Sequence, residues 1–187
     1  FLIKKKELSN SKSLFKYGWY FGFGYFLFSL YWISIALTFD ESFKFLIPLS
    51  TILLPAFLGI FYGLLTYLFS IFYSKSVVSS FFIFSILFGL IEFVRGSILS
   101  GFPWNLIVFS FSDSINFIQI LSVIGTYSLN LICISLFTMP AIFILRNSRK
   151  EIIVCLFFVL VSVGFWTFGS LKNNKFNSLE SIKNPYI

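Results

Sequence analysis

Five long apolar stretches, separated by short polar segments, dominate the chain. They cover approximately residues 16–38, 45–73, 77–94, 117–145 and 152–171. A helix needs about 20 mainly apolar residues to cross the roughly 30 Å hydrocarbon core of a bilayer, and the five stretches meet that requirement. The pattern therefore predicts an all-α integral membrane protein, built as a bundle of about five transmembrane helices.

The composition excludes an ordinary water-soluble domain. Of the 187 residues, 58% are hydrophobic and 11% are charged, whereas about one quarter of a typical soluble domain is charged. Phenylalanine alone occurs 29 times, and the mean hydropathy is +0.93. A single water-soluble core of this size could not hide so many apolar side chains. We expect lipid to face much of the surface.

Lysine and arginine are gathered in short clusters between the apolar stretches. The formal net charge is +7, but this placement is typical of topology signals and not of a nucleic-acid surface. With the amino-terminal end in the cytoplasm, nine basic residues lie inside and five outside. We therefore expect a cytoplasmic basic segment (residues 1–15), a transmembrane bundle (16–171) and an extracytoplasmic linker (172–187). The opening at Phe1 indicates a fragment, and we expect a further domain beyond the linker.

We expect no metal and no cofactor. The chain has no histidine, and Cys133 and Cys155 lack the Cys-x-x-Cys spacing of metal sites. Neither cysteine has an ionisable neighbour in sequence that would activate a thiolate. We interpret both as small hydrophobic residues inside apolar stretches.

The least generic stretch begins at the end of the third apolar segment, with Glu92 and Arg95. Residues three apart on a helix share a face, so the two charges can neutralise each other, which lowers the cost of placing them in a membrane. We keep two interpretations open. The pair ties the helix end to the next loop, or it also orients that loop or a lipid headgroup, because a guanidinium suits phosphate.

The loop over residues 97–116 is too short and polar to span a bilayer, yet it is rich in aromatic residues. It fits an extracytoplasmic, partly re-entrant loop, whose backbone has to be sheltered by protein or water. Gly101 and Pro103 interrupt regular helix there. Trp104 is interpreted either as an interfacial anchor or as part of a shaped pocket.

Two Gly-x-x-x-Gly patterns, Gly18 to Gly22 and Gly59 to Gly63, predict that helix backbones approach closely. We interpret them as packing within the bundle and not as a dimerisation face.

Several blocks of the chain resemble one family. Glu92-Phe93-Val94-Arg95-Gly96 and Ser100-Gly101-Phe102-Pro103-Trp104 look like the corresponding membrane segment of bacterial apolipoprotein N-acyltransferases. Residues 21–26 with Tyr31-Trp32, and residues 120–130 with Gly125, are also similar. Where the family often has Tyr-Ser-Gln after this block, the chain reads Phe109-Ser110-Phe111-Ser112.

The resemblance implies an acyltransferase of the bacterial cytoplasmic (inner) membrane. Such enzymes move an acyl chain from a phospholipid onto an enzyme cysteine, and then onto the N-terminal amine of a diacylglyceryl lipoprotein. The family's catalytic Cys, Glu and Lys lie in a nitrilase-like extracytoplasmic domain, so the resemblance implies no catalytic residue in this chain and no activity by the chain alone. It implies a substrate-binding or pocket-shaping role for Glu92, Arg95, Gly101, Phe102, Pro103 and Trp104.

Two other classes of protein remain open at this point. A transporter or channel subunit would also have several spans, but it would more often place several ionisable residues along a central path. The third class is a noncatalytic membrane scaffold.

Overall fold

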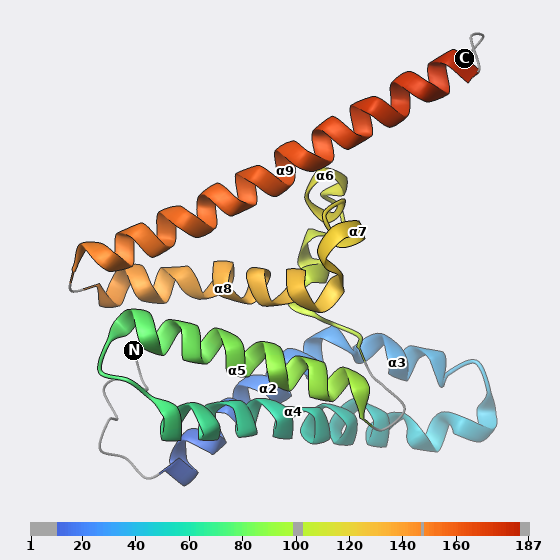
Figure 1. Cartoon of the computed structure of the whole chain (residues 1–187). Helices are drawn as coiled ribbons and strands as arrows, with labels where there is room; N and C mark the ends of the chain where they lie inside the picture. Colours follow the sequence, from blue (N-terminus) through green and yellow to red (C-terminus); the bar gives the residue numbers. More distant parts are fainter. Residues whose placement is uncertain (1–10, 99–102, 147, 184–187) are drawn as a thin grey trace. The chain divides into compact units, whose positions relative to one another are not determined.

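Helices make up nearly all of the regular structure in the computed structural model, which describes residues 11–98, 103–146 and 148–183 (Figure 1). Within these ranges there is no β-strand. The chain divides into a first unit, residues 1–105, and a second unit, residues 106–187. We describe each unit by itself.

The first unit contains three long helices, α2, α4 and α5. α2 spans Ser11–Ser29 and α3 spans Tyr31–Ala36, so the predicted stretch 16–38 is divided at Leu30. A 3-10 segment, η1 (Glu41–Leu46), leads into α4 (Ile47–Phe72), which has Pro48 in its first turn. Proline is tolerated there because the missing N–H would have no partner in the helix. α5 spans Val77–Ser97.

Glycines bring α2 and α4 into close contact. A methyl group added to Gly22 would lie 3.0 Å from the Cα of Gly59, and one added to Gly59 would lie 3.0 Å from the backbone nitrogen of Phe23. The Trp19 indole N–H donates to the Ala56 carbonyl across the same contact at 2.9 Å. The Gly-x-x-x-Gly patterns therefore pack against each other within one unit.

An aromatic core joins α5 to this pair of helices. The Tyr62 ring on α4 lies 5.2 Å from the Phe26 ring on α2 and 5.0 Å from the Phe88 ring on α5. Both Tyr62 and Phe26 are almost completely buried. Edge-on and tilted ring pairs at these separations add to the burial of apolar area, so one tyrosine links all three helices.

The second unit begins with short elements and ends with two long helices. η2 spans Ile107–Phe111, α6 spans Ile115–Ile118 and α7 spans Leu121–Ile124, followed by α8 (Thr126–Leu145) and α9 (Arg149–Lys183). Gly125 lies between α7 and α8 with φ +78°, a conformation that only glycine adopts without strain. The long helix therefore starts at Thr126, and two short helices lie before it within residues 115–124.

The core of the second unit lies where the short elements meet α8. Its buried residues are Leu106, Val108, Phe117, Ile120, Leu129 and Cys133. Asn130 on α8 is also buried, and its Oδ1 accepts a hydrogen bond of 3.0 Å from the Val108 backbone N–H. A buried backbone donor needs such a partner, so one amide fixes the start of η2 against α8. On α9, a methyl group at Gly169 would overlap the Asn116 carbonyl, so α6 and α9 are also in close contact.

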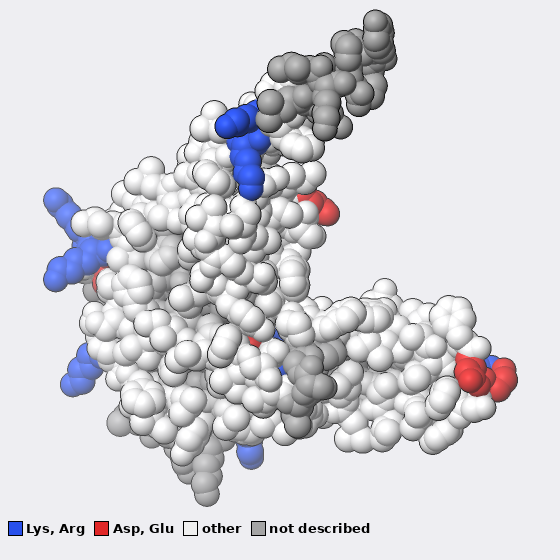
Figure 2. Space-filling view, turned by 45° about the vertical axis from the view of Figure 1, so that its right-hand side comes forward, with Lys and Arg blue, Asp and Glu red and all other residues white. Residues whose placement is uncertain are grey.

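Four helical segments are long and apolar enough to cross a membrane among the residues that the structure describes. They are Glu41–Phe72, Val77–Ser97, Thr126–Leu145 and Arg149–Phe176, and the shorter apolar segment Ile115–Ile124 accompanies them. Figure 2 shows a face on which charged side chains gather at a few places, with wide uncharged surface between them. The protein is an all-α, multi-pass membrane protein. That residues 16–38 cross as well stays a prediction.

Candidate functional site

A buried ion pair lies near the carboxyl end of α5. Glu92 and Arg95 are 0% and 1% exposed. The Arg95 Nη2 donates to Glu92 Oε2 at 2.5 Å, and its Nε donates to Oε1 at 3.3 Å. The guanidinium therefore meets both carboxylate oxygens, as in strong bidentate pairs. The pairing expected from the three-residue spacing is present.

Arg95 also connects α5 to the loop that follows it. Its Nη1 donates to the backbone carbonyl of Trp104 at 3.0 Å, and its guanidinium carbon lies 5.2 Å from the centre of the Phe26 ring on α2. A cation over an aromatic face is attracted by the ring. One side chain thus joins α5, α2 and the loop.

A second hydrogen bond holds the next residue of the loop. The Tyr25 hydroxyl on α2 donates to the Asn105 carbonyl at 2.8 Å. Asn105 has φ +59°, in the left-handed region that asparagine tolerates better than most residues. Two consecutive carbonyls, those of Trp104 and Asn105, are therefore fixed by α5 and α2.

Pro103 and Trp104 of the loop have exposed side chains. Trp104 is 52% exposed, and its ring lies 5.4 Å from the Trp32 ring on α3, at an interplanar angle of 30°. Pro103 is exposed too. The backbone is fixed while an indole pair stays accessible. Gly101 and Phe102, which the sequence grouped with these residues, lie outside the described residues.

The sequence did not single out three residues of the site, Tyr25, Phe26 and Tyr62. They stand in aromatic runs in which a residue that only packs cannot be told from one that also makes a polar contact. The Tyr62 hydroxyl is buried and has no hydrogen-bond partner among the described residues. For Tyr25 and Tyr62, the available signal was a tyrosine within an apolar helix, because a buried tyrosine hydroxyl usually needs a hydrogen-bond partner.

The hydrogen bonds of this arrangement hold the backbone of the loop in position. Within the described residues, no three His, Cys, Asp or Glu side chains lie together as metal ligands would. The two cysteines are free, with Cys133 buried and Cys155 half-buried. The site instead combines a neutralised ion pair, two fixed carbonyls and an exposed pair of indole rings.

Comparison with known proteins decides the family. Residues 1–139 match the family model of the apolipoprotein N-acyltransferase N-terminal domain. The chain belongs to this family. The matched range includes every residue of the site described above, together with most of α8.

Individual relatives agree with this assignment. The chain is 35% identical over 156 residues to an apolipoprotein N-acyltransferase of Brucella melitensis, covering 81% of this chain and 29% of the relative. It is 39% identical over 137 residues to one of Rhizobium etli, covering 73% and 26%. One of Rhizobium leguminosarum is 31% identical over 172 residues, covering 91% and 32%. The chain thus spans about three tenths of the length of these relatives. No solved structure matches.

Proposed function

We propose that this chain is the membrane part of an apolipoprotein N-acyltransferase. The complete enzyme transfers an acyl chain from a phospholipid to the N-terminal cysteine amine of diacylglyceryl lipoproteins in the bacterial inner membrane, a step of lipoprotein biosynthesis. The observation that carries the proposal is the family match over residues 1–139, in a chain with four apolar helices of spanning length. The proposed topology has a cytoplasmic amino end and an extracytoplasmic carboxyl end, supported by the distribution of basic residues.

Within this enzyme, Glu92 and Arg95 position the loop. The guanidinium is 1% exposed and already bonded to Glu92 and to the Trp104 carbonyl. This burial favours loop positioning over direct binding of a headgroup, because a phosphate would have to displace the internal partners. Trp104, with Pro103 beside it and Trp32 against its ring, provides the accessible surface for a lipid substrate. Gly101 and Phe102 belong to the same proposed surface.

The nucleophile of the reaction lies outside this chain in our proposal. Thioester formation needs an activated thiolate with acid–base assistance. Cys133 is 0% exposed, and no metal-like or acidic cluster surrounds either cysteine in the described residues. The nitrilase-like domain of the family provides the Cys, Glu and Lys. The chain alone is then inactive.

A chimera tests the proposal directly. Residues 1–187 replace the matching segment of the Brucella melitensis relative, and purified chimera is given phospholipid with radiolabelled acyl chains and a diacylglyceryl lipopeptide. We expect label on the lipopeptide amine. A chimera that inserts at the level of the unaltered relative but transfers no label would contradict the proposal.

Trp104→Ala in this chimera tests the role of the site. The change removes the accessible indole and a ring pair worth about 0.5–1.5 kcal/mol, so we expect acyl transfer to fall by about two- to tenfold while the amount of inserted protein stays constant. Phe109→Ala is the matched control, because Phe109 is an aromatic residue of similar exposure, 47% against 52%. An equal fall in activity and in protein level would indicate a structural role instead.

The transporter interpretation receives no support from the described residues. Their buried charged side chains are Glu92, Arg95 and Glu151. Glu151 accepts hydrogen bonds from the backbone and hydroxyl of Ser148 at the start of α9, and the other two neutralise each other. A transport path would place several ionisable groups along its course.

A further inference from the structure

A stretch of the first unit without buried side chains lies between Leu30 and Pro55. Both of these residues are buried, whereas none of residues 31–54 is. The stretch contains α3, η1 and the first two turns of α4, and we call it the arm. Few buried contacts hold the arm to the rest of the protein, which is typical of segments of low local stability.

The arm lies past the end of the third long helix of the unit. α4 and α5 are antiparallel and joined by residues 73–76. Figure 1 shows α3 and the start of α4 extending beyond the carboxyl end of α5. α5 has 21 residues, and the same number counted back from Phe72 along α4 reaches Ile52. The residues of α4 that belong to the arm therefore have little or no support from α5.

The backbone is interrupted in both helices where the arm begins. Leu30 separates α2 from α3, with φ −112° and ψ 5°, outside the α-helical region. Pro55 lies inside α4 and has no N–H, so the Thr51 carbonyl loses its helical donor. Each interruption weakens the connection between the arm and the helix that carries it.

The two interruptions lie at the same level of the unit. α2 and α4 are antiparallel and are in close contact at Gly22 and Gly59. Eight residues further along α2 is Leu30, and eight residues back along α4 is Thr51. Hinges consist of a few residues that absorb the change in backbone angles, and here two such points lie side by side.

Two contacts determine how the arm could move. The Thr51 hydroxyl donates to the Ser34 hydroxyl at 3.0 Å, which joins the two helices of the arm to each other. Trp32 on α3 lies against Trp104 of the loop, with ring centres 5.4 Å apart. The first contact keeps the arm together as one body. The second joins it to the candidate functional site through a single ring pair.

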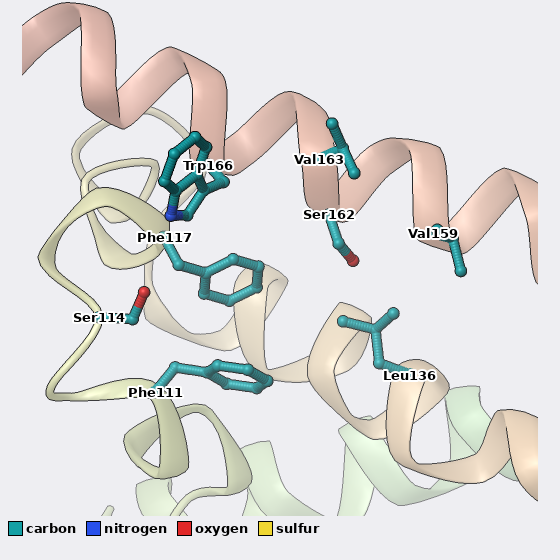
Figure 3. A pocket seen from close by; sticks show the side chains of 8 residues that line it. All are labelled: Phe111, Ser114, Phe117, Leu136, Val159, Ser162, Val163 and Trp166. Carbon is teal, nitrogen blue, oxygen red and sulfur yellow. The ribbon is translucent and has the colours of Figure 1, made fainter.

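Exposure alone does not produce such an arm. α9 of the second unit is also largely exposed, but it contacts its neighbours at several points. Figure 3 shows Val159 above Leu136 and Trp166 above Phe117, at the two ends of an open apolar pocket, and Phe158 beside them is buried. α9 is supported along its length, whereas the arm rests on the loop through a ring pair.

We propose that the arm moves as one body about Leu30 and Pro55, and that this movement covers and uncovers the ring of Trp104. In the docked position, which the structure shows, Trp32 lies against Trp104. In the displaced position the two indoles are separated. The movement itself does not depend on the proposed function. Its role, control of access to the Trp104 surface, rests on that function.

Distances between paired spin labels measure the movement in the whole chain, reconstituted into lipid nanodiscs. Cys133 and Cys155 are first replaced by Ala. One label is attached at Leu90→Cys on α5, and the other at Leu49→Cys in the arm or, as the control, at Leu64→Cys further along α4. All three leucines are exposed. We expect two distances or one broad distribution from the arm and a narrow distribution from the control. Equally narrow distributions would overturn the proposal.

Pro55→Ala tests the hinge in α4. It restores an N–H that can bond to the Thr51 carbonyl, so we expect the distances from the arm to α5 to become one narrow distribution. Pro48→Ala is the matched control, because Pro48 lies in the first turn of α4, where no helical bond is missing. An arm that moves as widely in the Pro55→Ala variant as in the unaltered chain would overturn the hinge.

Trp32→Ala tests the contact that holds the arm in its docked position. Loss of one aromatic pair should raise the ratio of displaced to docked arm by about two- to tenfold, measured with the same labels. Tyr31→Ala is the control, because the neighbouring Tyr31 ring is 60% exposed. A ratio that both changes raise equally, or that neither raises, would contradict the role of the ring pair.

Fluorine NMR provides a measurement that leaves both cysteines in place. Fluorinated tryptophan is incorporated throughout the chain, and the Trp32 signal is assigned by its loss in Trp32→Phe. We expect Trp32 to give two signals or one broadened by exchange, and Trp166 on α9 to give one narrow signal. Single narrow signals from both, at all temperatures at which the chain stays folded, would overturn the movement.

Activity of the complete enzyme separates the movement from its role. In the chimera described above, Pro55→Ala should lower kcat of acyl transfer several-fold, because opening of a covering segment limits many turnovers, and Pro48→Ala should leave it unchanged. If the unaltered chimera transfers no label, the proposed function fails, while the distance measurements still decide the movement. Full transfer by a Pro55→Ala chimera whose arm no longer moves would overturn the control of access.

Discussion

Glu92 and Arg95 in the first unit satisfy each other inside the protein, whereas Lys172 and Lys175 in the second unit keep their ammonium groups at the surface. The first pair is almost completely buried and bonded on several sides. Of the second pair, Lys172 makes one hydrogen bond to an exposed serine. Charge fixes backbone geometry in the first unit and lies at the surface in the second.

α4 of the first unit and α9 of the second also differ in how much of their apolar surface is covered. α2 and α4 approach so closely that added methyl groups at Gly22 and Gly59 would meet backbone atoms. In α9, by contrast, only 11% of the most apolar 18-residue stretch is buried inside the structure. The corresponding stretch of the segment that contains α4 is 28% buried. The first unit therefore relies on contacts between its own helices, and α9 exposes most of its apolar side chains. The following changes test this comparison.

Arg95→Leu should have the largest effect. It leaves the Glu92 carboxylate buried without its partner and frees the Trp104 carbonyl, a kind of change that costs about 3–5 kcal/mol. We expect the midpoint of urea unfolding in detergent, followed by circular dichroism, to fall strongly. Lys172→Leu in the second unit is the matched control and should change the free energy of unfolding by less than about 0.5 kcal/mol. Similar losses of stability from both variants would contradict the difference between the two pairs of charged residues.

Gly22→Val should come next in size. The added side chain would press on Tyr62 and on the Cα of Gly59, and such overpacking costs about 1–3 kcal/mol. Gly164→Ala on α9 is the control, because nothing lies within 4 Å of the position of its added methyl group. That change should be neutral or slightly stabilising, since alanine favours helix. Thermal unfolding of both variants in the same detergent makes the measurement.

Asn130→Leu should affect the second unit alone. It removes the acceptor of the Val108 N–H, and a buried unsatisfied donor costs about 1–3 kcal/mol. We expect faster hydrogen exchange at the Val108 amide, measured by mass spectrometry of peptides from η2. Exchange in α2 and α4 should stay unchanged. Faster exchange in both units would show that the loss is not local.

Tyr25→Phe should give the smallest effect of the four. It removes one hydrogen bond to the Asn105 carbonyl, worth about 1 kcal/mol, and keeps the ring. We expect a small fall in stability together with faster chemical labelling of a cysteine placed at position 104. Tyr20→Phe is the control, because the Tyr20 ring is 63% exposed. Equal labelling in the two variants would contradict the anchoring role of Tyr25.

The sequence predicts the membrane class and the central ion pair well because both depend on short-range patterns. Runs of apolar residues indicate α4, α5, α8 and α9, and the three-residue spacing indicates the contact of Glu92 with Arg95. The position of the loop is different, because the Tyr25 hydroxyl meets a carbonyl 80 residues further along the chain. No local pattern encodes that contact.

Local backbone features explain where the helix boundaries differ from the apolar stretches. Gly125 begins α8 at a positive φ, although the residues before it are as apolar as those after it. Residues 172–183 are polar and continue α9 as helix; that they form an extracytoplasmic linker stays a prediction. Hydropathy predicts whether a segment lies in the membrane. It does not predict whether the helix within that segment is interrupted.

The unbroken helix from Arg149 to Lys183 has a mechanical consequence. Its 35 residues extend roughly 52 Å, more than the roughly 30 Å thickness of a hydrocarbon core. Every hydrogen bond along it couples one turn to the next, so the helix resists torsion. A rotation of the buried part of α9 about its axis therefore also turns the helix at Lys183.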